Sequence, residues 1–374
     1  MSMPVRHRFY REQFPELDMT PDDRRNRWMI YGAYGATGRM IAHEAVRRGH
    51  HPLLAGRDGE QLSRFASELG LESLQVDLAD AAALETALGG VDLVVHAAGP
   101  FTITADPMQR ACLQAGTNYI DITGELPVFV ETYGRHRPAV DRGICLVSGC
   151  GFDVVPSDAV AAGIARRLPS VRDLLLVIDS NTTPTGGTVA SAVALAGEGG
   201  SVRRDGRLVR VPLLSGHERL ELPWGRRTIV PMPLGDLESA ARSTGASSIT
   251  TALALPSAIR PLLRVIAPLF RVAARSKWIR SFLGRRAHRL FTGPTAEQMS
   301  TLQARIWGRG RDDAGRTVEL WITVVEPYRF TAEVAVRAAE RILAERPIGA
   351  LTPSQAFGPD FPLEIEGSSR TIGS

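Results

Sequence analysis

The sequence predicts an α/β protein with two domains: a parallel-sheet domain first, and then an α+β domain whose sheet is mostly antiparallel. From residue 28 to about residue 149, short apolar runs alternate with helical stretches, which is typical of a parallel sheet with helices on both faces. Later, two β-rich runs, 300–311 and 316–326, are separated by the turn sequence Asp-Asp-Ala-Gly and indicate an antiparallel hairpin. With 374 residues, the chain is long enough for two cores.

The elements of the first domain follow from these apolar runs. Strands are expected at 28–32, 52–57, 74–78, 92–100, 118–123 and 144–149. Helices are expected at 38–49, 60–70, up to Leu88 and at 107–115. In the second domain, a helix up to Leu168 precedes a strand at 172–180, and a further helix at 331–346 has apolar residues at helical spacing. Residues 200–300 give no clear pattern.

Four segments follow from this pattern. Residues 1–26 form a polar arm without the apolar core of a signal peptide. Residues 27–150 form the first domain, and 151–330 the second, which is expected to hold the substrate and to take part in dimerisation. Residues 331–374 form a carboxyl-terminal helix and tail that we expect to return to the first domain.

A glycine-rich turn predicts a dinucleotide as the ligand of the first domain. Gly32, Gly35 and Gly38 follow the strand at 28–31 and precede a helix expected to begin near Arg39. This order of strand, turn, helix and second strand is the Rossmann-type fingerprint, in which glycines admit the pyrophosphate and Thr37 can add a hydroxyl. The alternative is a tight turn that binds nothing.

The end of the second strand favours NADP(H) over NAD(H). Enzymes that use NAD place an acidic residue there for the ribose hydroxyls, whereas this chain has Arg57, whose guanidinium suits a 2′-phosphate. The alternative for Arg57 is an ordinary surface charge. Asp77 lies where the third strand would meet the adenine, or else it caps the following helix. The expected cofactor-binding residues are Gly32, Tyr34, Gly35, Ala36, Thr37, Gly38, Arg57, Asp77, Ala97, Ala98, Gly99 and Pro100.

Composition argues against several classes of function. The net charge of +4 comes from scattered arginines, since Lys277 is the only lysine, so no nucleic-acid partner is expected. The three cysteines, Cys112, Cys145 and Cys150, fit neither a disulfide framework nor a metal pair, and they indicate a reducing, cytoplasmic compartment. No metal site is expected, because the eight histidines lack ligand spacing and His50-His51 fits a turn.

Several segments resemble the saccharopine dehydrogenase-like oxidoreductases, and among them the trans-acting enoyl reductase type. The matching segments are YGATGRM, LLAGRD, HAAGPF, NYIDITGE and GCGFDVVPSD, in this order, with PTGGTVAS and LTPSQAFG further on. The resemblance implies an NADP-dependent oxidoreductase with an amino-terminal Rossmann domain, a central α/β domain and a returning carboxyl-terminal segment. Its enoyl reductase type implies a role in lipid and glycolipid biosynthesis.

Four residues are candidates for catalysis. Tyr119, Asp121 and Glu125 lie near the carboxyl edge of the expected sheet, where open α/β folds bind ligands, and each of them is an alternative proton donor or a structural residue. Asp153 follows the sixth strand and is a further site candidate. A short-chain reductase is excluded because the position four residues before Lys277 is Ala273 instead of tyrosine.

Other polar residues have competing interpretations. Ser157 and Asp158 are as well explained by helix capping as by a ligand, and Cys150 is better explained as a small buried residue than as a nucleophile. Residues 186–188 could present amides to an anionic group or could only cap a helix. Residues 252–291 combine apolar residues with arginines and could lie on an anionic membrane or cover an acyl chain, or could simply pack on the second domain.

These observations predict an NADP-dependent reductase of a C=C or C=O bond in a hydrophobic, lipid or polyketide-derived substrate. The first alternative is a non-catalytic NADP-binding protein docked peripherally on a membrane through residues 252–291. The second alternative is an amino-acid dehydrogenase of the saccharopine type, which the near absence of lysine argues against.

Overall fold

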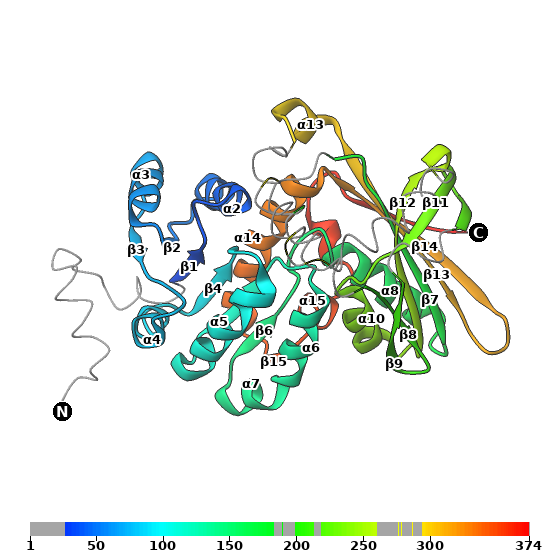
Figure 1. Cartoon of the computed structure of the whole chain (residues 1–374), viewed down its shortest axis with the longest axis horizontal. Coiled ribbons are helices and arrows are strands. Elements are labelled where there is room, and N and C mark those ends of the chain that lie inside the picture. Colours follow the sequence, from blue (N-terminus) through cyan, green and yellow to red (C-terminus); the bar gives the residue numbers. More distant parts are fainter. Residues whose placement is uncertain are drawn as a thin grey trace. The chain divides into compact units, whose positions relative to one another are not determined.

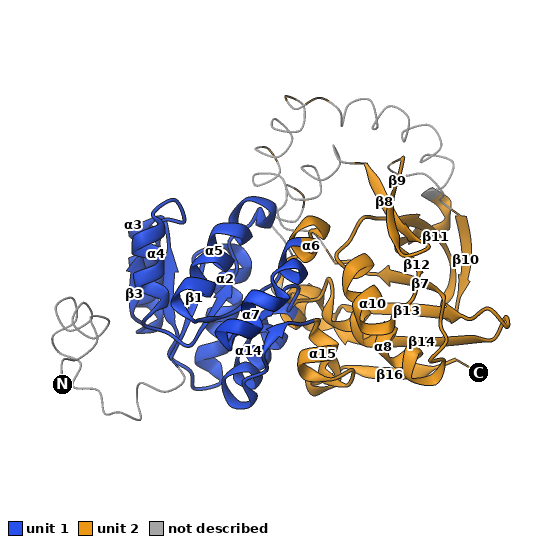
Figure 2. Ribbon diagram, turned by 90° about the horizontal axis from the view of Figure 1, so that it is seen from below, with its two compact units in different colours: residues 1–122, 131–150, 331–351 blue, residues 123–130, 151–330, 352–374 orange. Residues whose placement is uncertain are grey.

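The computed structural model describes residues 27–182, 199–212, 218–259 and 294–373, and the single residues Val189, Ser276, Trp278 and Arg286. Its chain divides into two compact units (Figures 1 and 2). Unit 1 comprises residues 1–122, 131–150 and 331–351, and unit 2 comprises residues 123–130, 151–330 and 352–374. The expected arm at 1–26 lies outside the described residues.

Unit 1 is built on a seven-stranded sheet in the order β15-β6-β5-β4-β1-β2-β3, and every pairing in it is parallel. The expected Rossmann-type sheet is therefore confirmed. Its strands are β1 (Trp28–Tyr31), β2 (Leu53–Gly56), β3 (Ser73–Gln75), β4 (Leu93–His96), β5 (Asn118–Asp121), β6 (Cys145–Val147) and β15 (Gly349–Ala350). Its helices are α2 (Ala36–Arg47), α3 (Gly59–Leu69), α4 (Ala81–Leu88), α5 (Phe101–Ala115) and α7 (His136–Arg142).

One face of this sheet packs into a hydrophobic core. Met29 of β1, Leu53 of β2 and Tyr119 of β5 pack there with Leu88 of α4 and Met108 of α5. Side chains at neighbouring positions of these strands, such as Ile30, point to the opposite face and are also buried. Burial on both faces explains why the strands are continuous apolar runs instead of alternating ones.

Two boundaries in unit 1 differ from the sequence prediction. Helix α2 begins at Ala36 instead of near Arg39, so Thr37 and Gly38 belong to its first turn. Helix α5 begins at Phe101, six residues before the predicted start at Pro107, and carries the proline inside it. A proline there leaves the carbonyl of Ile103 without its usual helical donor. Ile103 is 71% exposed, so water can satisfy that carbonyl.

Unit 2 is built on a nine-stranded sheet with the main order β10-β11-β12-β7-β13-β14-β16, to which β8 joins through β12 and β9 through β8. Only β12 and β7 are parallel, so the expected mostly antiparallel sheet is confirmed. The strands are β7 (Asp173–Asp179), β8 (Gly200–Arg204), β9 (Arg207–Val211), β10 (Glu218–Leu222), β11 (Gly225–Pro231), β12 (Ser248–Pro256), β13 (Gln303–Arg311), β14 (Thr317–Val325) and β16 (Ser369–Ile372). The predicted hairpin is the pair β13 and β14.

Helix α8 (Val155–Arg167) covers one face of this sheet. Gly308 and Gly310 of β13 allow the close approach: a Cβ on Gly308 would lie 2.5 Å from Cγ1 of Val160, and one on Gly310 would lie 2.4 Å from Cγ2 of Ile164. The remaining helices are α6 (Leu126–Gly134), α10 (Asp236–Thr244), α13 (Ala296–Thr301), α15 (Pro353–Phe357) and the short 3₁₀ helices η2 (Ser257–Ile259) and η3 (Phe361–Glu364). No helix among the described residues is long and apolar enough to cross a membrane.

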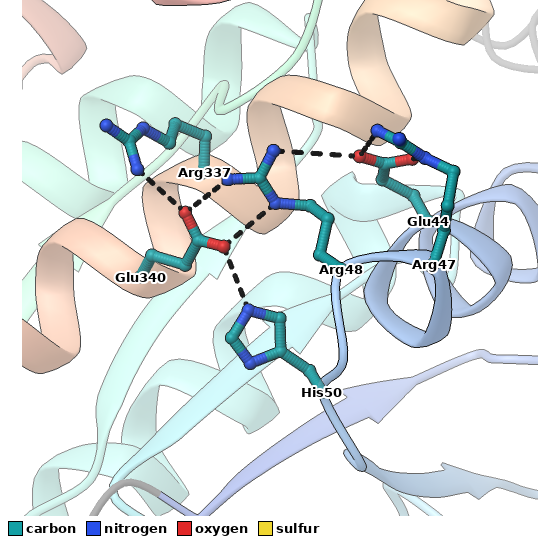
Figure 3. Close-up of polar contacts among 6 residues, drawn as sticks. All are labelled: Glu44, Arg47, Arg48, His50, Arg337 and Glu340. Atoms are coloured by element: carbon teal, nitrogen blue, oxygen red, sulfur yellow. Dashed lines mark hydrogen bonds and ion pairs between the residues drawn. The ribbon is translucent and has the colours of Figure 1, made fainter.

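Helix α14 (Pro327–Glu345) is the predicted carboxyl-terminal helix, and polar contacts hold its unit 1 part to the end of α2 (Figure 3). Glu340 accepts hydrogen bonds from Nε and Nη2 of Arg48 at 2.8 and 2.6 Å and from Arg337 at 3.0 Å, and its Oε1 lies 2.8 Å from Nε2 of His50. Strand β15 then extends the sheet of unit 1, but residues 352–374 belong to unit 2 and β16 pairs with β14. The expectation that the whole tail returns to the first domain is corrected accordingly, because backbone pairing at the edge of the second sheet holds its last part.

Candidate functional site

The glycine-rich turn closes on itself and on the end of β4. Gly32 has a φ of +83°, and a Cβ there would lie 2.8 Å from both Cβ and N of Ala98. A Cβ on Gly38 would lie 2.2 Å from the carbonyl oxygen of Gly32, and one on Gly35 would lie 3.2 Å from that atom. The turn therefore excludes any larger residue at Gly32 and Gly38, as a motif for close backbone approach requires.

The first turn of α2 is free to receive an anion. Gly35 is its N-cap and supplies no side-chain acceptor, and the first turn has no acidic residue. Tyr34 and Gly35 are half-buried, Ala36 is exposed, and Thr37 is half-buried in that turn. Helix amide groups without a capping side chain attract phosphate, so these residues fit the pyrophosphate of a dinucleotide.

Arg57 and Asp58, the two residues after β2, differ in their contacts. Arg57 has an exposed side chain. Asp58 instead caps α3: its carboxylate accepts hydrogen bonds from N and Nε2 of Gln61 at 3.1 and 2.6 Å, which lower the pKa of Asp58. The ring of Tyr34 lies against Gly56, where a Cβ would be 2.6 Å from Cε1 of Tyr34. The carboxylate nearest the ribose position is thus engaged elsewhere, which fits a 2′-phosphate better than a free ribose hydroxyl.

Asp77 and the loop after β4 complete the predicted cofactor residues. Asp77 is exposed, and its carboxylate accepts a hydrogen bond from the amide of Ala79 at 2.9 Å. Asp80, not Asp77, is the N-cap of α4, so the alternative role for Asp77 is wrong. Ala97 and Ala98 are half-buried beside the glycine turn, and Gly99 and Pro100 are exposed.

His96, the last residue of β4, is a buried polar group that sequence reasoning missed. Burial lowers the pKa of His96 to about 3, so its imidazole is neutral. Its Nε2 lies 3.1 Å from Oγ1 of Thr104, which in turn donates to the carbonyl of Ala98 at 2.6 Å. Through Thr104, His96 therefore stabilises the loop that follows β4. The signal in the sequence was a histidine at the end of an apolar run.

Tyr119 and Asp121 lie together in unit 1, but neither reaches solvent. Both side chains are fully buried. The carboxylate of Asp121 accepts hydrogen bonds from the hydroxyl of Tyr119 at 2.7 Å, the hydroxyl of Ser148 at 2.8 Å and the amide of Gly149 at 2.8 Å. Desolvation and the neighbouring Asp121 raise the pKa of Tyr119 well above its usual value. The prediction that these two residues donate protons is corrected: they tie β5 to the segment after β6.

The cysteines are buried and free. The amide of Cys150 donates to the carbonyl of Asp121 at 2.6 Å, and burial raises the pKa of its thiol well above the usual range. A neutral, enclosed thiol is a poor nucleophile, which agrees with the interpretation of Cys150 as a small buried residue.

Glu125 and Asp153, the other two catalytic candidates, belong to unit 2 and differ in exposure. Glu125 is buried and forms an isolated bridge with Leu234, so its predicted role as a proton donor to substrate is also corrected. Asp153 has an exposed side chain. The protein packed around its carboxyl group reduces the hydration of that group, and this desolvation raises the pKa of Asp153 to about 6. A Cβ on Gly124 would lie 2.9 Å from Oδ2 of Asp153, so glycine is needed beside this carboxylate.

Two buried carboxyl groups lie at the first turn of α8: Asp158 belongs to that turn, and Asp236 of α10 contacts it. The hydroxyl of Ser157 donates to Oδ1 of Asp236 at 2.5 Å, while Asp158 accepts from the hydroxyl of Ser243 at 2.6 Å and the amide of Ser354 at 2.7 Å. Capping of α8 by Ser157 or Asp158 is therefore wrong, because their side chains reach other elements and the N-cap is Val154, without a side-chain bond. Desolvation raises the pKa of Asp236 well above its usual value. Asp236 was not predicted, since it lies in the region without a clear pattern.

Two predicted features lie wholly or mostly outside the described residues. Residues 186–188 lie outside the described residues. Of the predicted amphipathic segment 252–291, residues 252–256 are the end of strand β12 and 257–259 form η2. Apart from Ser276, Trp278 and Arg286, the rest of that segment is not among the described residues.

Comparison with known proteins identifies the first domain. Residues 28–141 match the family model described as the saccharopine dehydrogenase NADP binding domain. The chain carries a saccharopine dehydrogenase-type NADP-binding domain. The predicted cofactor NADP(H) and, for this domain, the predicted resemblance to saccharopine dehydrogenase-like proteins are thereby confirmed.

Relatives with curated names agree with this family. The chain is 32% identical over 188 residues to a trans-acting enoyl reductase of Mycobacterium leprae, covering 46% of this chain and 45% of that protein. It is 29% identical over 216 residues to a saccharopine dehydrogenase-like oxidoreductase of Mus musculus, covering 50% of this chain and 49% of that protein. The chain thus spans about half the length of the curated relatives it matches.

A solved structure shares the fold of nearly the whole chain. Apo saccharopine dehydrogenase (L-Glu forming) from Saccharomyces cerevisiae aligns with a TM-score of 0.63 at 12% identity, covering 93% of this chain and 100% of that one. At this identity the similarity concerns the fold alone.

Proposed function

We propose that the chain is an NADP-dependent oxidoreductase that reduces a C=C or C=O bond of a hydrophobic substrate. The observation that carries the proposal is the cofactor cradle: a glycine turn without room for side chains, an uncapped α2, and Arg57 exposed beside the engaged Asp58. An uncapped helix start receives phosphates, and an exposed guanidinium can pair with a 2′-phosphate.

Asp153 is the residue we propose as proton donor. NADPH, when bound, supplies a hydride to the substrate. The carboxyl of Asp153 is exposed and, with its pKa raised to about 6, holds a proton closer to neutral pH than an ordinary aspartate does. It would transfer that proton to the carbon or oxygen atom that carries the electron pair after reduction, and then regain a proton from water.

The names of the relatives support an enoyl or carbonyl substrate. Enoyl reductases occur among the proteins that are 32–33% identical, whereas the similarity to the solved saccharopine dehydrogenase (L-Glu forming), at 12% identity, concerns the fold alone. We therefore do not favour amino-acid dehydrogenation. A lipid substrate, a homodimer and peripheral membrane contact through residues 252–291 stay predictions of the sequence.

Nucleotide titration tests the cofactor part of the proposal. Binding is followed by quenching of tryptophan fluorescence, and we expect the wild type to bind NADPH more tightly than NADH. Arg57→Ala should lower the affinity for NADPH by about 10 to 100-fold and leave the affinity for NADH unchanged. Arg64→Ala is the matched control, because Arg64 is an exposed arginine of α3 that pairs only with Glu60 among the described residues. Absence of binding, or an unchanged preference in Arg57→Ala, would contradict the assignment.

A further inference from the structure

The phenol of Tyr34 is a polar group of the glycine turn to which the proposed function assigns no role. Tyr34 is half-buried, and its ring lies over the end of β2. A Cβ on Gly56 would be 2.6 Å from Cε1 and 3.2 Å from Cδ1 of this ring, so only glycine leaves room for it. The turn thus places an aromatic side chain across the end of β2 that is followed by Arg57.

The backbone of Tyr34 is restrained from the side of α2 and α3. Nε of Arg39 donates a hydrogen bond to the carbonyl of Tyr34 at 3.3 Å. The guanidinium of Arg39 lies over the ring of Phe65, 4.1 Å from its centroid, and its Nη1 lies 3.6 Å from Oε2 of Glu68. Because these contacts hold Arg39, they also hold Tyr34, so little conformational freedom is lost when its side chain meets a ligand.

The hydroxyl of Tyr34 keeps a proton that it can donate. The amide of Asp58 donates to Oη of Tyr34 at 3.4 Å, so the hydroxyl oxygen is the acceptor in this contact. A phenol is both acceptor and donor. Within the described part of the chain, no protein group accepts a hydrogen bond from this hydroxyl. The O–H lies beside the peptide bond that joins Arg57 to Asp58, and is therefore available to a ligand held by Arg57.

Two carboxylates lie in the same region, and both accept hydrogen bonds from amides that follow them in the chain. Asp58 accepts from the amide of Gln61 at 3.1 Å, and Asp77 accepts from the amide of Ala79 at 2.9 Å. Arg57 forms no ion pair within 4 Å with these or with other described residues. A ribose 2′-hydroxyl needs a free carboxylate, whereas a 2′-phosphate needs donors, and the available groups here are donors.

We propose that the hydroxyl of Tyr34 is a second ligand of the 2′-phosphate of NADP(H), and that it determines specificity for NADP(H) together with Arg57. The inference rests on the proposed placement of that phosphate at Arg57. A phosphate monoester has three terminal oxygens that accept hydrogen bonds, so one can accept from the phenol while others pair with the guanidinium. NAD(H) lacks this phosphate and gains nothing from either group.

Nucleotide titration of Tyr34→Phe, with the full chain, tests the proposal. This substitution keeps the ring over Gly56 and removes only the hydroxyl. We expect it to lower the affinity for NADPH by about tenfold, because a hydrogen bond to a charged acceptor is lost, and to leave the affinity for NADH unchanged. The affinity for 2′,5′-ADP, which carries the 2′-phosphate without the nicotinamide, should fall by the same factor. The double variant Tyr34→Phe/Arg57→Ala should bind NADPH no more tightly than NADH.

Tyr31→Phe is the matched control. Tyr31 belongs to β1, the strand that leads into the same turn, and its hydroxyl already donates to the carbonyl of Val76 at 3.1 Å. Its side chain is buried. Loss of this hydroxyl should change the affinities for NADPH and NADH by the same factor, so the preference between them stays as in the wild type.

Three results would overturn the proposal. Unchanged NADPH affinity in Tyr34→Phe would do so and would leave the cofactor assignment intact. Equal losses for NADPH and NADH in Tyr34→Phe, or an equally selective loss in Tyr31→Phe, would give the Tyr34 hydroxyl a structural role in the turn instead. A wild type that binds neither NADPH nor 2′,5′-ADP would overturn both this inference and the proposed cofactor site.

Discussion

At the residue scale, burial and hydrogen bonding give different roles to aspartates that look equivalent in the sequence. Asp121 is buried and accepts three hydrogen bonds, Asp236 is buried with one hydroxyl donor, and Asp153 is exposed. A carboxylate that accepts several hydrogen bonds is a structural acceptor, whereas one that keeps a proton near neutral pH can act as an acid. Chemistry of the proposed type therefore belongs to Asp153.

Replacement of Asp153 tests this role. We expect Asp153→Asn to lower kcat/KM for reduction of a long-chain trans-2-enoyl thioester by about 100-fold or more, with unchanged NADPH affinity. In the wild type, kcat/KM should fall as pH rises through about 6, the pKa of Asp153, because only the protonated carboxyl donates. The variant should lack this pH dependence, and the exposed Asp205→Asn should retain it. A similar pH dependence in Asp153→Asn would assign the acid to another group.

Asp236 should limit stability at high pH. Its pKa is raised in the folded state, so the folded chain holds a proton that the unfolded chain releases near pH 3.8. Stability is therefore fully present below pH 3.8 and declines by about 1.4 kcal/mol per pH unit above it, until the folded-state carboxyl ionises. Asp236→Asn should remove this decline in urea unfolding at several pH values, whereas the exposed Asp141→Asn should preserve it. Parallel pH curves for wild type and Asp236→Asn would refute the prediction.

At the element scale, α14 is fixed in unit 1 by one carboxylate at the centre of a cationic cluster. Glu340 meets Arg48, His50 and Arg337, and the cluster joins the carboxyl-terminal helix to the end of α2, nearly 300 residues earlier in the chain (Figure 3). Partial burial opposes ionisation of Glu340, but these hydrogen bonds outweigh it and lower the pKa of Glu340 to about 2.

Glu340→Gln should destabilise the protein in a pH-dependent way. Because the pKa is lowered, the stabilisation is present above about pH 4.5 and is lost as pH falls towards 2. At pH 7 we expect a loss of about 1 to 3 kcal/mol in the free energy of unfolding, measured by urea titration. Glu345→Gln removes an exposed pair with Arg341 on the same helix and should cost about 0.5 kcal/mol or less. Equal effects of the two substitutions would contradict a special role for Glu340.

At the scale of the whole molecule, the two units are interleaved along the chain. Residues 123–130 belong to unit 2 although they lie between parts of unit 1, and the tail supplies β15 to one sheet and β16 to the other. Each unit therefore needs a segment from the far end of the chain, which raises the sequence separation of its contacts.

Removal of residues 352–374 should affect unit 2 alone. A chain ending at Leu351 loses β16 and the amide of Ser354, which donates to the buried carboxylate of Asp158. A buried carboxylate without this donor is costly. We expect a lower melting temperature for unit 2 and unchanged NADPH affinity. In calorimetry, NADPH should raise only the melting temperature of unit 1, the unit that binds it. Loss of NADPH binding in this variant would show that unit 1 also depends on the tail.

The sequence alone determined those features that depend on local order. The strand and helix rhythm of residues 28–149, the glycine turn, the β13–β14 hairpin and α14 were predictable, since backbone geometry and apolar spacing are local. Arg57 and Asp153 could be named as candidates because each directly follows a predicted strand or turn.

Only the tertiary structure decided which polar residues are buried and where the tail belongs. Tyr119, Asp121 and Glu125 occur in one short exposed-looking motif, yet packing buries all three, and Asp236 reaches Ser157 from 79 positions away. The division of the tail between two sheets likewise depends on strands that are distant in sequence. Burial and long-range pairing are sums over many non-local contacts, so local spacing carries no signal for them.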